Sequence, residues 1–267
     1  MGGVRADVRL VELGLAPSRE KARSLIMAGA VYCGATRVDK AGAMVPPEAE
    51  LTLKEQPIPY VSRGGLKLRK AIEQYGLNLN GAIAADIGAS TGGFTDCMLQ
   101  NGAARVYAID VGYGQLDWRL RQDERVVVME RTNARNISPD WFEGELDFAS
   151  MDVSFISVGL ILPGLFRCLK EGAKAVVLVK PQFEAGRDKV GKHGVVRERD
   201  THIQVLEDVS AVCTKIGFAV EQVDYSPITG PKGNIEFLLV LSRGGLSVEG
   251  IGQRIQHVVD EAHRQLS

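Results

Sequence analysis

From residue 62 onward, short and strongly apolar segments alternate with longer amphipathic ones. A short run that is apolar at nearly every position predicts a strand buried on both faces of its sheet. Strands that alternate with helices indicate an open, doubly wound α/β sheet. The predicted strands are Ile83–Ile87, Arg105–Asp110, Val126–Glu130, Leu146–Met151, Lys174–Val179, Phe218–Val223 and Phe237–Leu241.

The last two predicted strands are separated by a segment rich in proline and glycine, from Pro227 to Gly233. Such a turn indicates an antiparallel pair at the sheet edge. We therefore expect a Rossmann-like domain over residues 62–267, with a mostly parallel seven-stranded sheet whose last strand runs antiparallel. The segment from Ser247 to Leu266 has apolar residues at helical spacing, and we expect it to be an amphipathic helix packed on this domain.

A different pattern occupies residues 1–55 and predicts a small α+β domain. A first helix carries Val8, Val11 and Leu15 on its apolar face and ends near Gly14 and Pro17; a second is capped by Ser18 and buries Ala22, Leu25 and Ile26. Short strands are expected around Gly34-Ala35 and at Glu50–Leu53. Residues 56–61, with two prolines, predict a short stiff linker.

The composition is that of a globular protein of 267 residues with 45% hydrophobic content. A net charge of -1 means that any affinity for a polyanion must come from local basic patches. The four cysteines are scattered, which predicts neither a metal site nor a disulfide framework. Arg5, Asp7 and Arg9 leave no signal-peptide hydrophobic region, and Pro163 interrupts the most apolar later run. We expect a cytoplasmic protein without a membrane partner.

A glycine-rich turn follows the first strand of the larger domain, in the stretch Asp86-Ile87-Gly88-Ala89-Ser90-Thr91-Gly92-Gly93. Glycines let the backbone approach a ligand, and the helix that begins near Phe94 offers free N–H groups. One strand later, Asp110 stands where an acidic side chain holds the hydroxyls of an adenosine ribose. The turn indicates a nucleotide-type cofactor, and a turn that binds nothing is the alternative.

Two features of this turn favour S-adenosylmethionine over a nicotinamide dinucleotide. The spacing is Asp-x-Gly-x-x-x-Gly-Gly rather than Gly-x-Gly-x-x-Gly, and a cofactor without a pyrophosphate needs no glycine against that group. Asp86 is expected to bind or orient the cationic amino group of the ligand, and Asn133 is expected on the adenine side. The residues assigned to the cofactor are Asp86, Gly88, Ser90, Gly92, Asp110 and Asn133.

Four charged residues form the predicted catalytic set: Lys67, Asp152, Lys180 and Glu236. Asp152 and Lys180 directly follow predicted strands, where open α/β sheets have their ligand crevice. A ribose hydroxyl is a poor nucleophile, so its methylation needs a base and exact placement. We assign Lys180 as the base, because Lys67 and the cofactor sulfonium favour its neutral form by like-charge repulsion. The alternative is that these residues form ordinary surface ion pairs.

Other methyl acceptors leave marks that this chain lacks. Enzymes that methylate base amino groups usually carry Asn/Asp-Pro-Pro-Tyr/Phe after the fourth strand, where this chain has Asp152-Val153-Ser154-Phe155. Carbon methylation of pyrimidines needs a cysteine nucleophile, and three cysteines here fall inside predicted helices. An oxygen acceptor, a ribose 2'-hydroxyl, is favoured.

The motifs resemble those of the TlyA-type ribosomal RNA 2'-O-methyltransferases, also called the haemolysin A family. The resemblance covers nearly the whole chain, and the larger domain is similar to the heat-shock methyltransferase FtsJ, whose Lys-Asp-Lys-Glu tetrad maps onto the four residues above. It implies methylation of a cytidine ribose in 16S or 23S ribosomal RNA on ribosomal subunits. The matching stretches are residues 60–68, 86–96, 110–116, 130–135, 154–157 and 180–184.

The first domain resembles the S4-type RNA-binding domain through Arg5-x-Asp7, Gly14-Leu15, Ser18-Arg19 and the segment from Ile26 to Gly29. It departs from that pattern at Gly34-Ala35, where members usually carry Asn-Gly; a glycine at the first position still suits a type II' turn.

Two basic segments are expected to contact RNA phosphates. Residues 18–40 and residues 187–199 each carry five basic and two acidic side chains. The second segment lies on a glycine-bearing loop after Lys180, and one hypothesis is that this loop is a lid that orders on RNA. A solvated surface is the alternative reading for both. The residues assigned to RNA are Arg5, Arg19, Arg23, Arg63, Lys189 and Arg197.

Two other functions stay open at this point. One is a non-catalytic RNA-binding factor of ribosome assembly, which would bind the cofactor without transferring a methyl group. The other is a membrane-lytic haemolysin, for which the amphipathic C-terminal segment is the one supporting feature.

Overall fold

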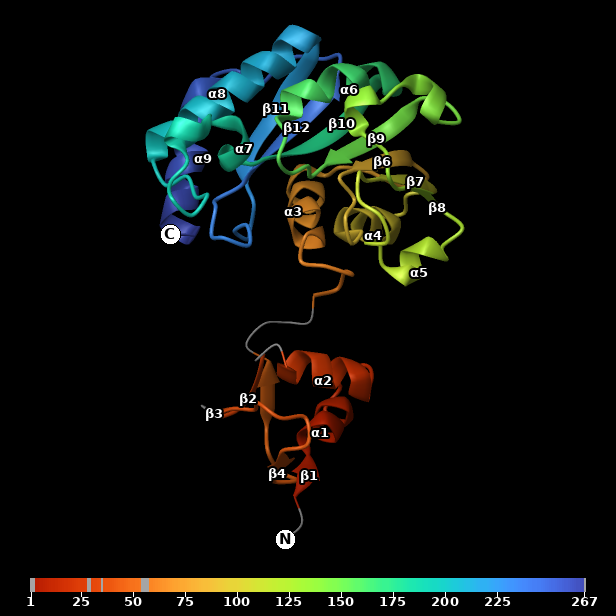
Figure 1. Ribbon diagram of the computed structural model, residues 1–267, viewed down its shortest axis with the longest axis vertical. Helices are drawn as coiled ribbons and strands as arrows, with labels where there is room; N and C mark the ends of the chain where they lie inside the picture. The colour runs from red at the N-terminus through yellow and green to blue at the C-terminus, as the bar shows by residue number, and fades with distance from the viewer. Residues whose placement is uncertain (1–2, 28–29, 35, 54–57, 267) are drawn as a thin grey trace. The chain divides into compact units, whose positions relative to one another are not determined.

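The computed structural model describes residues 3–27, 30–34, 36–53 and 58–266. The chain divides into two compact units, Met1–Pro59 and Tyr60–Ser267, which are described separately (Figure 1). The expected turn residue Ala35, the end of the segment from Ile26 to Gly29, and residues 56 and 57 of the expected linker lie outside the described residues.

The first unit packs two helices against short strands. A two-stranded sheet pairs β1 with β4, and a three-stranded sheet has the order β3-β2-β5. Its elements are β1 (Val4–Arg5), α1 (Ala6–Glu12), α2 (Arg19–Met27), β2 (Val31–Cys33), β3 (Thr36–Arg37), β4 (Met44–Val45) and β5 (Leu51–Leu53).

The helices of this unit were predicted with mixed success. The cap on α2 is confirmed, because the Lys21 N–H donates to Ser18 Oγ at 3.2 Å. The predicted face of the first helix is correct in part: Val11 and Leu15 are partly buried and pack against the core, but the fully buried residues of the helix are Ala6, Asp7 and Leu10. Since α1 ends at Glu12, Leu15 lies outside the helix. Val8 and Val11 are half-buried.

The second unit is built on a seven-stranded sheet with the order β11-β12-β10-β9-β6-β7-β8. Its strands are β6 (Ile83–Ile87), β7 (Arg105–Ile109), β8 (Val126–Met129), β9 (Leu146–Met151), β10 (Leu169–Val179), β11 (Phe218–Tyr225) and β12 (Phe237–Arg243). The neighbours from β8 to β10 are parallel, whereas β12 is antiparallel to both β10 and β11. The predicted fold class is confirmed, and so is the antiparallel last strand; β12 lies between β10 and β11, so β11 occupies the edge.

Helices cover both faces of this sheet, which explains why its strands are apolar throughout. Figure 1 shows α3 and α4 on one face and α6 and α8 on the other. The predicted C-terminal helix is confirmed as α9, which buries Ile255, Val258, Val259 and Ala262. The helices are α3 (Gly65–Tyr75), α4 (Gly93–Gln100), α5 (Trp118–Arg121), α6 (Leu162–Cys168), α7 (Pro181–Glu184), α8 (Arg199–Ile216) and α9 (Ile251–Leu266), with 3-10 turns η1 (Ala134–Asn136), η2 (Pro139–Trp141), η3 (Val158–Leu160) and η4 (Arg187–Lys189).

Among the described residues, no helix is long and apolar enough to cross a membrane. The same part of the chain contains no group of three or more His, Cys, Asp or Glu side chains that could hold a metal ion. Cys97, Cys168 and Cys213 are buried in helices, as predicted.

Candidate active site

The sheet topology brings the predicted catalytic residues to one edge. Asp152 directly follows β9 and Lys180 directly follows β10, at the carboxyl ends of neighbouring parallel strands. Glu236 directly precedes β12, and because Val179 pairs with Phe237 in the antiparallel register, the start of β12 lies beside the end of β10. The fourth residue, Lys67, lies in the first turn of α3.

The four side chains form a line of alternating charge. Lys67 Nζ lies 2.6 Å from Glu236 Oε2 and 3.7 Å from Asp152 Oδ2. Lys180 Nζ lies 2.5 Å from Asp152 Oδ1 and donates to Ser154 Oγ at 2.9 Å. The Glu236 side chain is only 2% exposed. Charges buried this deeply persist when they are paired, and two lysines with two carboxylates give the set no net charge.

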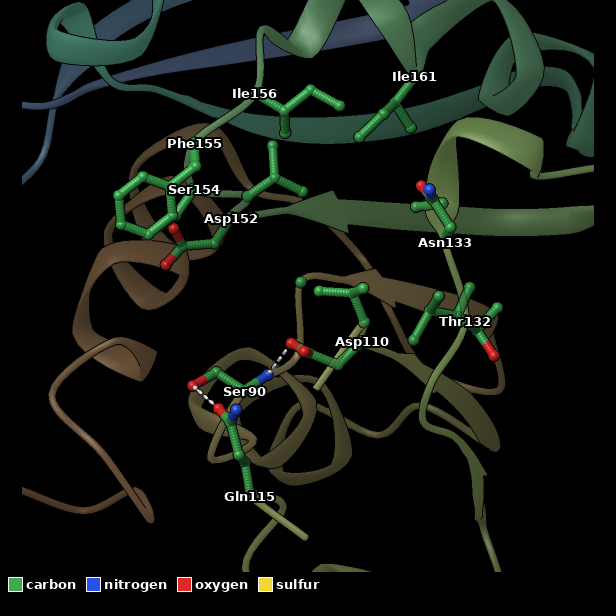
Figure 2. Close-up of a pocket in the computed structure, with 15 residues that line it drawn as sticks. Ser90, Asp110, Gln115, Thr132, Asn133, Asp152, Ser154, Phe155, Ile156 and Ile161 are labelled. Carbon is green, nitrogen blue, oxygen red and sulfur yellow. Dashed lines mark hydrogen bonds between the residues drawn. The ribbon is translucent and has the colours of Figure 1, made fainter. Parts of the chain in front are cut away.

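A cavity of about 320 Å³ lies beside this line of charges. Figure 2 shows Asn133 and Thr132 at one end and Asp152 and Phe155 at the opposite end, with Asp110 and Ser90 between them. Asp110 Oδ2 accepts from the Ser90 N–H at 2.8 Å, and its Oδ1 accepts from the Gly112 N–H at 2.7 Å. The carboxylate is therefore fixed on the cavity wall.

The glycine-rich turn shapes this cavity through close backbone contacts. A Cβ on Gly88, where φ is +84°, would lie 2.6 Å from the backbone oxygen of Asp152, so the turn and the β9 end approach as closely as they do only with glycine there. Ser90 has a φ of 49°, an uncommon conformation for a residue with a side chain. Asn133 lines the cavity, and its Oδ1 accepts from the Arg135 N–H at 3.1 Å, which caps η1. Asp110, Gly88, Ser90 and Asn133 are thus brought together.

Two residues assigned to the cofactor lie elsewhere. Asp86 is fully buried and lines neither this cavity nor the smaller one beside it. Its Oδ2 accepts from the backbone N–H and the hydroxyl of Thr95 at 2.8 and 2.7 Å, and its Oδ1 accepts from Ser150 at 3.1 Å. Burial raises the pKa of Asp86 to about 7. Asp86 therefore faces neither cavity, and its expected role toward a cationic amino group stays a prediction; in this structure the carboxyl joins β6 to α4.

Gly92 has an equally structural position. It precedes α4 with a φ of 94°, and a Cβ there would lie 2.2 Å from Leu120. We conclude that Gly92 shapes the turn and the packing of α5, while Gly93 lines the smaller cavity.

The smaller cavity, of about 170 Å³, joins the turn to the catalytic line. It shares Gly88, Ser90, Asp152 and Ser154 with the larger cavity and is also lined by Lys180, Ser62, Gly64 and Gly93. Here the first turns of α3 and α4 meet: a Cβ on Gly93 would lie 2.9 Å from the backbone nitrogen of Gly65. The sequence analysis included residues 62–67 in a matching stretch but did not predict that they line a cavity. The glycines at the starts of two helices could have indicated this, because helix N-termini offer free N–H groups.

A pair of aromatic side chains beside the line of charges, exposed Phe155 and half-buried Phe183, was also missed. Phe155 is 90% exposed and adopts a φ of 65°, and its ring centroid lies 5.0 Å from that of Phe183. Both residues stand in motifs that the sequence analysis quoted. The exposure of Phe155 and its contact with Phe183 are properties of the folded chain, so the sequence pattern carried no signal for them.

The predicted RNA-binding residues of the first unit are brought together by Asp7. Its buried carboxylate lies 2.9 Å from Arg5 Nε, 3.1 Å from an Arg19 nitrogen and 3.3 Å from Arg23 Nε. The hydrogen bond from Arg5 lowers the pKa of Asp7, and Arg19 and Arg23 add to this effect. Each of the three arginine side chains is 44–55% exposed. The result is a fixed cluster of guanidinium groups on the surface.

The predicted RNA-binding residues of the second unit are exposed and lie on separate segments of the chain. Arg63 donates to the backbone oxygen of Thr229, in the loop between β11 and β12. Lys189 and Arg197 lie on the loop between α7 and α8. Asn234 joins these two loops, because its Nδ2 donates to the Gly194 oxygen at 2.9 Å and its Oδ1 accepts from the Val196 N–H at 3.0 Å. That the loop between α7 and α8 orders on RNA as a lid stays a hypothesis.

Comparisons with known proteins agree with this geometry. A family model described as an FtsJ-like methyltransferase matches residues 60–243, and one described as an S4 domain matches residues 4–51. The Bacillus subtilis protein YqxC, whose name assigns it rRNA methyltransferase activity provisionally, is 53% identical over 98% of this chain and 95% of its own. TlyA of Mycobacterium tuberculosis H37Rv, named a 16S/23S rRNA (cytidine-2'-O)-methyltransferase, is 41% identical over 96% of this chain and 97% of its own.

A solved structure extends the similarity to three dimensions. The Streptococcus thermophilus protein, provisionally named a hemolysin, is 49% identical to this chain and aligns with a TM-score of 0.78. The alignment covers 99% of this chain and 97% of that one.

Proposed function

Because the chain belongs to the TlyA/hemolysin A family of S-adenosylmethionine-dependent rRNA methyltransferases, with an S4 domain and an FtsJ-like domain, we propose that it methylates the 2'-hydroxyl of a cytidine in ribosomal RNA. The substrate is a ribosomal subunit, 30S or 50S, in the cytoplasm. We assign residues 1–55 to the RNA-binding domain, residues 56–61 to the linker and residues 62–267 to the catalytic domain, although Tyr60 and Val61 of that linker belong to the second compact unit.

The residues around the two cavities fit S-adenosylmethionine. Asp110 would accept from the ribose hydroxyls, and Asn133 would lie on the adenine side at the far end of the larger cavity. The joined helix starts at Gly64 and Gly93 offer N–H groups and positive dipole ends to the carboxylate of the amino acid part. When bound, the cofactor supplies a sulfonium-activated methyl group and brings one positive charge to the site.

Lys180 is the proton acceptor in this proposal. The four catalytic side chains carry no net charge before the cofactor binds, so an added positive charge is balanced when Lys180 is neutral. A neutral Lys180 Nζ takes the proton from the ribose 2'-hydroxyl as that oxygen gains the methyl group. Asp152, paired with both lysines, holds Lys180 in place, and Glu236 holds Lys67.

The pair of Phe155 and Phe183 provides a stacking surface for the target base. Aromatic side chains stack on unpaired bases, and enzymes that modify a nucleotide inside a folded nucleic acid rotate it out of its stack. Phe155 lines the larger cavity next to Asp152, so a base stacked there would place its own ribose near the catalytic line. Arg5, Arg19 and Arg23 would fix the RNA elsewhere through its phosphates.

The observation that carries the proposal is the buried, alternating Lys67–Glu236 and Lys180–Asp152 pairing at the mouth of a nucleotide-sized cavity. The test is transfer of labelled methyl groups from S-adenosylmethionine to purified 30S and 50S subunits. We expect label in RNA from the wild type and from Lys170→Ala, a change in an exposed lysine paired with Asp147, but not from Lys180→Ala.

The two rival functions give different results in the same experiment. Cofactor binding without label on either subunit would favour a non-catalytic assembly factor. Leakage of liposomes by the wild type that persists in Lys180→Ala would favour a membrane-lytic protein.

A further inference from the structure

Two loops at the active site are attached to each other at three successive points. The first loop spans residues 154–158 after β9, and the second spans residues 180–184 after β10. Lys180 Nζ donates to Ser154 Oγ at 2.9 Å, and the Phe183 ring lies 5.0 Å from the Phe155 ring. At the far end, the Val158 N–H donates to Glu184 Oε1 at 2.9 Å.

The Glu184 side chain accepts a hydrogen bond from a backbone N–H of the first loop that would otherwise lack a partner in its own turn. Val158 is the first residue of η3, so its N–H has no partner within that turn. Ser157 satisfies the next free group by accepting from the Gly159 N–H at 3.2 Å. Glu184 reaches Val158 from α7 and also lines a small neighbouring cavity, together with Val205 and Val209. Burial raises the pKa of Glu184, and hydrogen bonds with the Val158 N–H and the Ser157 side chain oppose that rise. These two contacts offset the solvation cost of holding the carboxyl here.

Between the two hydrogen bonds, Ile156 is half-buried and packs against the core, whereas the Phe155 side chain is exposed to solvent. Phe155 is 90% exposed and has a left-handed backbone, with φ at 65°. Such a conformation in a residue with a side chain persists when the surroundings determine it from both sides. Ser154 is fixed upstream by Lys180, and Val158 is fixed downstream by Glu184. Ser154, Phe155 and Ile156 also form one wall of the larger cavity.

We propose that Glu184 is a positioning residue of the methyltransferase site, which holds the 154–158 loop so that Phe155 receives the target base and Ser154 contacts Lys180. This inference rests on the proposed function. Glu184 lines neither active-site cavity, so its effect is transmitted through the loop. This role requires a side chain long enough to place a hydrogen-bond acceptor at the Val158 N–H. It does not require a negative charge.

The experiment compares Glu184→Ala, Glu184→Gln and Glu184→Asp in the full-length protein. Glutamine keeps an acceptor at the same reach, whereas aspartate keeps the charge on a shorter side chain. Asp208→Ala is the matched control, because this exposed carboxylate lines the same small cavity and bonds to Gln204. The readouts are methyl transfer to subunits, S-adenosylmethionine affinity, and amide hydrogen exchange over residues 154–158.

We expect Glu184→Ala and Glu184→Asp to lower kcat by about tenfold or more, since small misplacements of a reacting group have large effects on rate. Glu184→Gln and Asp208→Ala should stay within about threefold of the wild type, because a neutral acceptor keeps the hydrogen bond. Cofactor affinity should change less than kcat in every variant. Exchange at residues 154–158 should accelerate in the alanine and aspartate variants and not in the glutamine variant.

Three results would overturn the inference. They are a wild-type rate in both Glu184→Ala and Glu184→Asp, a loss in Glu184→Gln as large as in Glu184→Ala, and unchanged exchange over residues 154–158 in the alanine variant. If the wild type itself labels no subunit, the proposed function fails; the exchange measurement needs no activity and still decides whether Glu184 holds the loop.

Discussion

Removing the charge of Glu236 should destabilise the catalytic domain and stop methyl transfer. Glu236→Gln keeps the shape of the side chain and one acceptor oxygen, so the change isolates the charge. It leaves Lys67 buried, and Asp152 Oδ2 at 3.7 Å is then its remaining carboxylate partner in the part of the chain that the structure describes. The four-residue set then carries a net charge of about +1 inside a poorly solvated site.

The magnitude follows from the geometry of the pair. At 2.6 Å, the attraction between Lys67 and Glu236 is about 6 kcal/mol for an effective dielectric constant of about 20. Loss of one partner from a buried pair typically costs about 3–5 kcal/mol, and we expect the lower end because glutamine still accepts a hydrogen bond. For a domain of this size, about 3 kcal/mol corresponds to a fall of about 6–12 °C in Tm.

Tryptophan fluorescence can report this unfolding for the catalytic unit by itself. Both tryptophans of the chain, Trp118 and Trp141, lie in residues 60–267. Glu73→Gln is the control, since that carboxylate is 67% exposed and lies 3.7 Å from Arg69 one helical turn away; it should change stability by less than about 0.5 kcal/mol. If the free energy of unfolding of Glu236→Gln lies within about 1 kcal/mol of the wild-type value and the variant still methylates RNA, the charge-balance reasoning is refuted.

Three further outcomes are expected. Asp110→Ala should weaken S-adenosylmethionine binding about tenfold or more, because a charged acceptor for the ribose hydroxyls is lost. Calorimetry measures this affinity, and Asp123→Ala is the control that should leave it unchanged. Equal affinities in Asp110→Ala and the wild type would show that Asp110 does not bind the cofactor. Phe155→Ala should lower kcat/KM on ribosomal subunits about fivefold or more, because stacking on one base contributes about 1–3 kcal/mol. Cofactor affinity and Tm should not change, because the ring is exposed. An unchanged kcat/KM would exclude base stacking on Phe155. Because the pKa of Asp86 is raised to about 7, the folded protein binds more protons at this group than the unfolded chain between about pH 4 and pH 7, and the wild type loses stability as pH rises through that window. Asp86→Asn should therefore make the free energy of unfolding, measured with urea, depend less on pH in this range. The same pH dependence in both proteins would contradict the raised pKa.

The sequence predicted the catalytic line because strand ends are visible in an apolar pattern. Asp152 and Lys180 each stand one residue beyond a buried run, and residues in that position of a parallel sheet meet at one edge. Asp110 occupies the same position after β7 and lines the cavity as expected. Asp86 differs by one residue: it is the fourth of five residues in β6, so the alternation of side chains turns it toward α4 instead of the crevice.

Other features depended on contacts that no local pattern encodes. The insertion of β12 between β10 and β11 is a choice among long-range pairings, each compatible with an apolar strand. The face of α1 was misjudged because Ala6 and Leu10 are its fully buried apolar residues, whereas Val8 and Val11 of the predicted stripe are only half-buried. The attachment of Glu184 to Val158 joins residues 26 positions apart and likewise required the fold.

The central claim, that the acceptor is a ribose oxygen, is tested most directly by locating the label after methyl transfer. RNA from labelled subunits is hydrolysed in alkali, which needs a free 2'-hydroxyl at each cleaved bond. We predict that the label is recovered in an alkali-resistant dinucleotide whose first residue is 2'-O-methylcytidine. Label recovered in a single nucleotide carrying a methyl group on its base would contradict the account.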